Sequence, residues 1–160
     1  MKVYNLEFNN KATQTWMLLK QTAILCDQLA EQTLLDTGVT AETLTVLSIL
    51  DKAKGSVIPA ELARYTSRTN QTLAGLINRL ERDDLAQRIK KAKGHPYTEV
   101  VITPKGKQLV KKASKVYDKL MSDMGALLCT KDHETLQYRL GLIRDEAASR
   151  LHLKVINKKY

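Results

Sequence analysis

The sequence predicts a mainly α-helical fold with one small β hairpin, and three features of the chain lead to this prediction. Apolar residues recur at three- and four-residue spacing over most of the 160 residues, as on the buried face of a helix. A short helix, a tight turn and a longer helix follow one another between residues 60 and 84. A basic stretch with weak alternation and a turn containing Gly and Pro comes next. This order predicts a winged helix–turn–helix with long helices at both ends of the chain.

The first predicted helix runs from Lys11 to about Leu35 and has two apolar faces. A helix that packs only on its own domain needs one such face, so the second face predicts contact with another subunit. Gly38 suits the left-handed conformation that ends a helix. The apolar residues at helical spacing are Trp16, Leu19, Ala23, Cys26 and Ala30, with Leu18, Leu25 and Leu29 on the adjoining face.

A second helix is predicted over 41–52, with Thr40 as its N-cap. The segment 56–58 is short and contains the β-branched residues Val57 and Ile58, so it suits one rung of a small sheet. Pro59 fits the first position of the next helix, where its missing N–H costs nothing. That helix, Ala60–Tyr65, is the first of the helix–turn–helix pair.

The second helix of the pair starts after a turn at 66–68, with Thr69 as its predicted N-cap. Leu73, Leu76, Ile77 and Leu80 form its apolar stripe. An exposed helix start can be polar for solubility alone, but this motif favours contacts with bases or phosphates. The predicted DNA-binding residues here are Arg68, Thr69, Asn70, Gln71, Thr72, Asn78 and Arg79. Arg82 is expected to pair with Asp83 or another neighbour. Glu61, Glu81, Asp83 and Asp84 are interpreted as solvated or dipole-compensating charges.

Gly75 lies in the middle of this helix, where glycine costs about 1 kcal/mol relative to Ala. Close approach to the DNA backbone would account for it, and so would tight helix packing. The sequence leaves both explanations open.

The hairpin is predicted from Ala86–Lys91 and Tyr97–Thr103, joined by a turn at 92–96. Its cations suit the minor groove or the flanking phosphates. Residues 60–112 hold twelve Lys and Arg against five Asp and Glu, so they carry +7 of the chain's net +9. This coincidence of charge and motif favours nucleic acid as the partner. The predicted DNA-binding residues of the wing are Arg88, Lys90, Lys91, Lys93 and His95.

Two long helices complete the chain. Thr103-Pro104 starts one that runs to about Leu128, and Thr130 or Asp132 is expected to cap the last. We expect residues 1–36 and 108–160 to form a helical dimerisation region around a DNA-binding region at 37–107. The predicted dimerisation residues are Trp16, Leu19, Leu140, Ile143 and Leu151.

Composition argues against other classes of protein. Cys26 and Cys129 are too few for a disulfide framework. The chain shows no membrane span and no signal peptide, which predicts a cytoplasmic location. No His or Cys pair has metal-ligand spacing, and no nucleophile–base arrangement or phosphate loop is present. We therefore expect no metal, no cofactor and no enzymatic activity.

The chain resembles the MarR (multiple antibiotic resistance regulator) family of winged-helix repressors. The residues that carry the resemblance are Leu62-Ala63, Arg79-Leu80-Glu81, Arg88, and Ile102-Thr103-Pro104-Lys105-Gly106. The resemblance implies a homodimer that binds a palindromic operator and releases it when a small ligand or oxidant arrives. Some members sense peroxide through a Cys on the first helix. Cys26 lies on an apolar stripe with no nearby cation, which favours a buried structural thiol over a redox sensor.

Two departures from the family pattern are present. Asp84 stands where the family often has Gly after the recognition helix. The wing has Lys-Ala-Lys-Gly-His-Pro where the family usually has Asp-x-Arg or Asp-Arg-Arg, whose Arg enters the minor groove. We expect this wing to contribute more to affinity than to sequence choice.

The leading hypothesis is a homodimeric, sequence-specific transcriptional regulator, in particular a repressor, on an inverted-repeat operator. The alternative is a winged helix used as a non-specific architectural or protein-interaction module, whose DNA affinity would follow salt alone.

Overall fold

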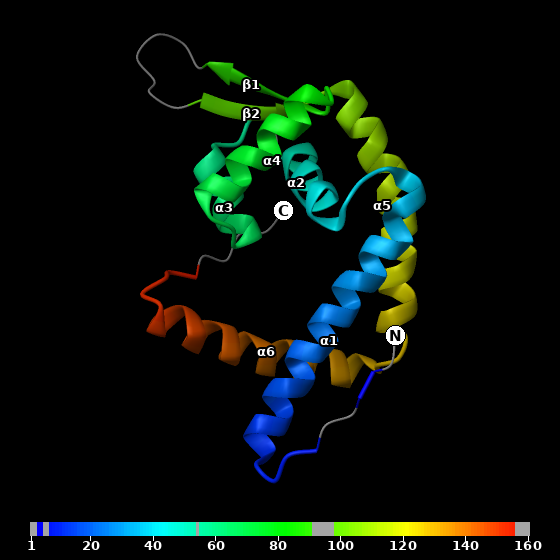
Figure 1. Ribbon diagram of the computed structural model, residues 1–160, viewed down its shortest axis with the longest axis vertical. Coiled ribbons are helices and arrows are strands. Elements are labelled where there is room, and N and C mark those ends of the chain that lie inside the picture. The colour runs from blue at the N-terminus through cyan, green and yellow to red at the C-terminus, as the bar shows by residue number, and fades with distance from the viewer. Residues whose placement is uncertain (1–2, 5–6, 54, 91–97, 156–160) are drawn as a thin grey trace. The chain divides into compact units, whose positions relative to one another are not determined.

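The computed structural model describes residues 3–4, 7–53, 55–90 and 98–155. The chain divides into two compact units, Met1–Tyr117 and Asp118–Tyr160. The elements are α1 (Lys11–Leu34), the 3-10 helix η1 (Leu35–Thr37), α2 (Ala41–Lys52), α3 (Pro59–Thr66), α4 (Asn70–Arg82), β1 (Ala86–Lys90), β2 (Thr98–Ile102), α5 (Pro104–Gly125) and α6 (Thr130–Arg150). This order confirms the predicted mainly helical fold with one β hairpin (Figure 1).

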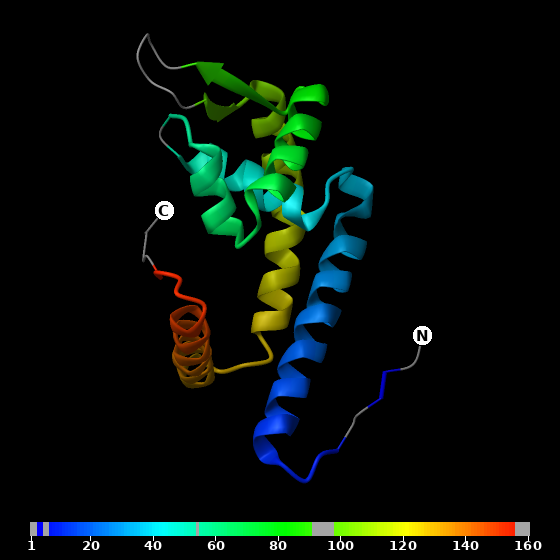
Figure 2. The same cartoon turned by 60° about the vertical axis from the view of Figure 1, so that its left-hand side comes forward.

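Asn10 is the N-cap of α1, and its Oδ1 accepts hydrogen bonds from the backbone N–H groups of Ala12 and Thr13. The helix passes into η1, and Gly38 ends the turn in the predicted left-handed conformation, at φ 77°. Only Ala30 and Leu34 of α1 are buried. The C-terminal end of α1 lies next to the other helices of the first unit, and its N-terminal end lies away from α2–α4 (Figure 2). The other apolar side chains of α1 are therefore exposed or only half-buried.

The core of the first unit lies where α2, α3 and α4 meet the hairpin (Figure 1). Leucines contribute most of it, and fully burying one such side chain is worth about 1.5–3 kcal/mol. The helical spacing that predicted the inward positions of α2 and α4 is confirmed. The largest fully buried side chains of the whole described chain are Leu34, Leu47, Leu50, Leu62, Leu73, Ile77, Leu80, Val46 and Val100.

The turn between α3 and α4 fixes the helix–turn–helix. Pro59 occupies the first turn of α3, as predicted. Ser67 ends the helix in the left-handed conformation, at φ 53°, and its N–H donates to the carbonyls of Ala63 and Arg64. The N–H of Arg68 also donates to Ala63 O, at 3.0 Å. Two of the carbonyls that the end of α3 would leave unpaired, those of Ala63 and Arg64, are thus satisfied within the turn.

The hairpin pairs β1 and β2 antiparallel, with Ala86 opposite Ile102 and Lys90 opposite Thr98. Val57 adds the predicted rung to this sheet, because it exchanges both backbone hydrogen bonds with Val100, at 2.9 and 2.8 Å. The predicted strand residues Lys91 and Tyr97 lie outside the described residues, and β2 ends at Ile102, one residue before the predicted Thr103. The loop between α2 and α3 is therefore held against the base of the wing.

α5 starts at the predicted Thr103-Pro104 signal. Thr103 Oγ1 accepts from the N–H of Gly106 at 3.0 Å and donates to Asp84 O at 2.8 Å. One hydroxyl therefore joins the start of α5 to the loop that follows α4. The helix ends at Gly125, earlier than the predicted Leu128.

The second unit holds the end of α5 and all of α6. Cys129 occupies the N-cap position of α6, so the predicted capping by Thr130 or Asp132 is wrong. Asp132 instead lies one turn in and accepts from Cys129 Sγ at 3.0 Å. The His133 Nε2 lies 2.9 Å from Gly125 O and closes the turn between the two helices. No residue of α6 is buried.

Within the described ranges no helix taken singly has the length and hydropathy to cross a membrane; α1 with η1 passes only when combined with α2, across a 75° bend.

Candidate nucleic-acid interface

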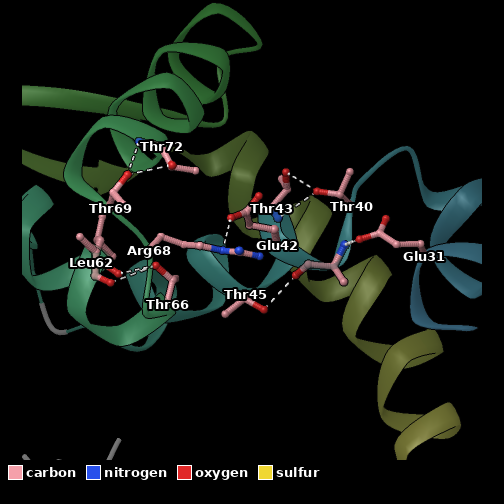
Figure 3. Close-up of polar contacts among 12 residues, drawn as sticks. Glu31, Thr40, Glu42, Thr43, Thr45, Leu62, Thr66, Arg68, Thr69 and Thr72 are labelled. Carbon is pink, nitrogen blue, oxygen red and sulfur yellow. Dashed lines mark hydrogen bonds and ion pairs between the residues drawn. The ribbon is translucent and has the colours of Figure 1, made fainter. Parts of the chain in front are cut away.

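α4 presents a polar face to solvent. Thr69 caps it as predicted, with its Oγ1 accepting from the N–H of Thr72 at 3.2 Å (Figure 3). The four predicted apolar residues are buried against the core. Every residue predicted to bind DNA from this helix and its turn is exposed: Arg68, Thr69, Asn70, Gln71, Thr72, Asn78 and Arg79. The face opposite the core is therefore open over the whole length of the helix.

Arg68 lies in the turn before α4, but its side chain is directed towards α2. Its Nε contacts Glu42 Oε1 at 3.0 Å (Figure 3). Glu42 is in the first turn of α2, beside the capping pair Thr40 and Thr43. Because the Arg68 side chain is 56% exposed, the pair is largely solvated and orients the guanidinium more than it stabilises the fold.

A second charge network joins α4 to β1. Arg88 forms an ion pair with Glu81 through its guanidinium, and its backbone N–H donates to the same carboxylate at 2.8 Å. Its Nη2 also donates to Asn78 Oδ1 at 2.7 Å. Interpreting Glu81 as a solvated charge was therefore wrong: this carboxylate is half-buried and holds the base of the wing against α4.

Sequence reasoning missed the network, although a signal was present. Arg88 is two residues from the buried Ala86 and opposite the buried Val100, so it lies on the inward face of the hairpin. A charged side chain on such a face requires a partner. The neighbouring helix end supplies one in Glu81.

The expected pair between Arg82 and Asp83 is confirmed, at 3.2 Å. The Asp83 carbonyl also accepts from Lys105 Nζ at 2.7 Å. Glu99, another acid of the basic region, is 5% exposed, and its carboxylate accepts a hydrogen bond from the hydroxyl of Ser56. Asp83 and Glu99 are thus engaged within the fold, as Glu81 is.

The predicted wing residues are described only in part. Arg88 lies at the base of the wing, and Lys90 ends β1. Lys91, Lys93 and His95 lie outside the described residues. The position of these three residues at the tip of the wing therefore stays a prediction from the sequence.

The residues predicted to form a dimer are largely exposed within the chain. Trp16 is 53% exposed and Leu151 67%, and Leu19 is half-buried. Leu140 and Ile143 on α6 are also exposed. Cys26 on α1 is a free, half-buried thiol, so the chain by itself covers it only in part. No group of three metal-ligating side chains occurs among the residues that the structure describes.

No family model matches the chain, and no curated protein matches its sequence. Solved structures do match its fold. The Staphylococcus aureus MepR–DNA complex aligns with a TM-score of 0.75 at 20% identity, over 88% of this chain and 99% of that one. The organohalide-sensing regulator RdhR-CbdbA1625, in its 2,4-dichlorophenol-bound form, aligns with a TM-score of 0.82 at 17% identity, over 100% of this chain and 99% of that one. The transcriptional regulator PA3341 gives 0.74 at 23% identity, over 84% and 98%.

These likenesses extend over nearly the full length of each regulator. They agree with the helix–turn–helix, the hairpin and the long flanking helices described above. The fold of this chain is a winged helix–turn–helix of the MarR type.

Proposed function

We propose that the chain is a MarR-family regulator of transcription that binds a specific DNA sequence as a homodimer and represses the genes beside it. The observation that carries the proposal is the exposed polar face of α4, held outward by the buried stripe on its other side. A capped helix with such a face is the element that helix–turn–helix proteins place in the major groove. The MepR structure, which has this fold, is a DNA complex.

In this proposal the start of α4 reads bases and Arg79 contacts a phosphate. The wing cations Lys90, Lys91, Lys93 and His95 hold the flanking backbone and supply affinity in a salt-dependent way. The +7 charge of residues 60–112 supports this role. The internal pairing of Glu81, Asp83 and Glu99 leaves fewer carboxylates to oppose a phosphate backbone.

Dimerisation is proposed through regions 1–36 and 108–160, around the DNA-binding region 37–107. α1 and α6 both expose large apolar side chains that the chain does not cover, Trp16, Ile24, Leu140 and Ile143 among them. Exposed apolar patches of this kind mark interfaces in soluble proteins. A two-fold dimer would place two copies of α4 on half-sites about one helical turn apart, which makes an inverted repeat.

The test is selection from a random DNA pool, followed by footprinting on the selected sequence. We expect an inverted repeat protected on both half-sites. Gln71→Ala should weaken binding to the selected site by roughly tenfold, the size of one lost base contact. The matched control is Gln28→Ala, which removes an exposed Gln from α1 that is not among the predicted dimerisation residues. Sedimentation should show its dimer mass unchanged, and its DNA affinity should then equal that of the wild type. Binding without any consensus, with affinity following salt alone, would instead establish a non-specific or protein-interaction module.

Dimerisation has a separate test. Sedimentation of the wild-type chain should give twice the monomer mass of 18.0 kDa. Leu140→Asp combined with Ile143→Asp should give the monomer with its helix content retained, because both side chains are exposed within one chain. A wild-type chain that sediments as a monomer at micromolar concentration would refute the proposal.

We further propose that a small effector releases the DNA. RdhR-CbdbA1625 was crystallised with 2,4-dichlorophenol, so a protein with this fold can hold a small aromatic molecule. Screening small aromatic compounds for loss of the DNA complex, with dimer mass as the control, tests this step.

A further inference from the structure

The amide of Asn78 is held in one orientation by the wing. Arg88 Nη2 donates to Asn78 Oδ1 at 2.7 Å, and the same guanidinium is paired with Glu81. A guanidinium has five donors and no acceptor, so only the oxygen of the Asn78 amide can face it. The oxygen is thereby directed towards β1, and the two N–H donors of the amide remain to meet an external partner.

Asn78 stands on the part of α4 that faces away from the core. It follows Gln71 by two turns and is next to Gly75 and Arg82 on the same face, opposite the buried Leu73, Leu76 and Ile77. All four residues of this face are exposed. If α4 enters the major groove as proposed above, Asn78 lies on the side that meets the base edges.

The fixed orientation limits which base Asn78 can select. A free Asn amide recognises adenine with both groups, its oxygen accepting from N6 and its nitrogen donating to N7. With the oxygen turned towards Arg88 and one of its lone pairs engaged there, the amide directs its two N–H donors away from β1, towards an external partner. Guanine presents two acceptors in the major groove, O6 and N7; cytosine presents a donor, and adenine places a donor beside its acceptor.

We propose that Arg88 is a positioning residue that converts Asn78 into a hydrogen-bond donor, so that Asn78 specifies guanine rather than adenine in each half-site. Arg88 acts on the DNA through Asn78, and Glu81 fixes the guanidinium that does so. This inference rests on the proposed function and concerns one base pair of the operator.

The experiment is random-pool selection with the wild-type chain and four variants, scored by base preference at each position. Asn78→Ala should relax one symmetric pair of positions, at which the wild type prefers guanine by roughly tenfold. Asn78→Asp keeps an acceptor for Arg88 but loses the donors, so the guanine preference should disappear or change to cytosine. Gln71→Ala should relax a different base pair and leave this one intact.

The Arg88 variant separates positioning from a structural role. Arg88→Met with Glu81→Gln removes the guanidinium without leaving an unpaired carboxylate, and it frees the Asn78 oxygen. The preference at the Asn78 position should change from guanine towards adenine. A merely structural role would lower affinity for every sequence equally and leave the preferred base unchanged, which would overturn the proposal. Circular dichroism and denaturation of this variant confirm that it is folded.

Two further results would overturn the inference while the proposed function stands: adenine at the position that Asn78→Ala relaxes, or a wild-type consensus that Asn78→Ala leaves unchanged at every position. Absence of any consensus with the wild-type chain would overturn the proposed function itself, and this inference with it.

Discussion

Leu85 and Gly106 approach so closely that the backbone carbonyl oxygen of Leu85 occupies the space that a Cβ on Gly106 would need. Such a Cβ would also lie 2.8 Å from Ile102 Cγ1, closer than real Cβ atoms come. The same Leu85 carbonyl accepts from the N–H of Thr103 at 3.1 Å. The loop that follows α4, the end of β2 and the start of α5 therefore meet at a point that only glycine fits.

Gly106→Ala is expected to lower the free energy of unfolding by about 1–3 kcal/mol, the usual cost of overpacking a tight site. The obstructing atom is backbone, so it cannot turn aside as a side chain would. Chemical denaturation followed by circular dichroism measures the change. Unaltered stability would show that the contact with Leu85 relaxes at little cost.

Gly75→Ala should have the opposite effect on stability. Apart from its chain neighbours and the nearby backbone of α4 itself, no described atom lies within 4 Å of a Cβ built there, so packing within the described chain does not account for this glycine. Replacing a mid-helix Gly by Ala should stabilise α4 by about 0.5–1 kcal/mol. If close approach to DNA is the reason for Gly75, the same variant should bind the selected site more weakly in a fluorescence anisotropy titration. Undiminished DNA affinity would leave neither of the two explanations standing.

Asp84 adopts the left-handed conformation, at φ 57°, directly after α4. Glycine occupies that region without the steric penalty that a Cβ brings. Asp84→Gly relieves about 1–2 kcal/mol of steric cost in the left-handed conformation and loses about 0.4–1 kcal/mol through the greater entropy of the unfolded chain. The free energy of unfolding is therefore expected to rise by up to about 1 kcal/mol. Asp84→Asn removes the charge but keeps the side chain, so a comparable gain from that variant would assign the effect to charge and not to the backbone.

Thr69 and Thr40 cap α4 and α2 with the same geometry. Each hydroxyl accepts from an N–H three residues on, at 3.2 and 3.1 Å respectively, and each lies 2.9 Å from the hydroxyl of that residue. Thr69→Ala and Thr40→Ala should each cost about 1 kcal/mol of stability. Only Thr69→Ala should also reduce binding to the selected DNA beyond what its stability loss explains, since α4 alone is proposed to enter the groove. Equal DNA affinities for the two variants would contradict that assignment.

The local features of the fold could be predicted because the residues that determine them are close in the sequence. Thr40, Thr69 and Thr103 are caps three residues from the N–H groups they accept from, and Gly38 ends a turn by its own backbone freedom. Val57 could be assigned to a strand because both it and its neighbour Ile58 are β-branched. Such signals need no knowledge of which elements meet.

The candidate site could be predicted only as a set of exposed polar residues. The contacts from Arg88 to Glu81 and Asn78 join a strand to a helix, and they depend on how the hairpin sits on α4. Glu99 and Ser56 are farther apart still, and their pairing follows from the Val57 bridge. The cap of α6 was misassigned because Cys129 is a weak capping residue next to two strong ones, and backbone geometry selected it.

The bridge between Val57 and Val100 also bears on how the chain folds. All of α3, α4 and β1 lies between these two residues in the sequence, so the bridge closes a long loop. Loop closure of this kind costs chain entropy that is recovered only when the enclosed elements pack together. The amide protons of Val57 and Val100 should therefore exchange with deuterium only in openings that release this whole segment, so the helix pair and the wing base form and melt as one cooperative unit.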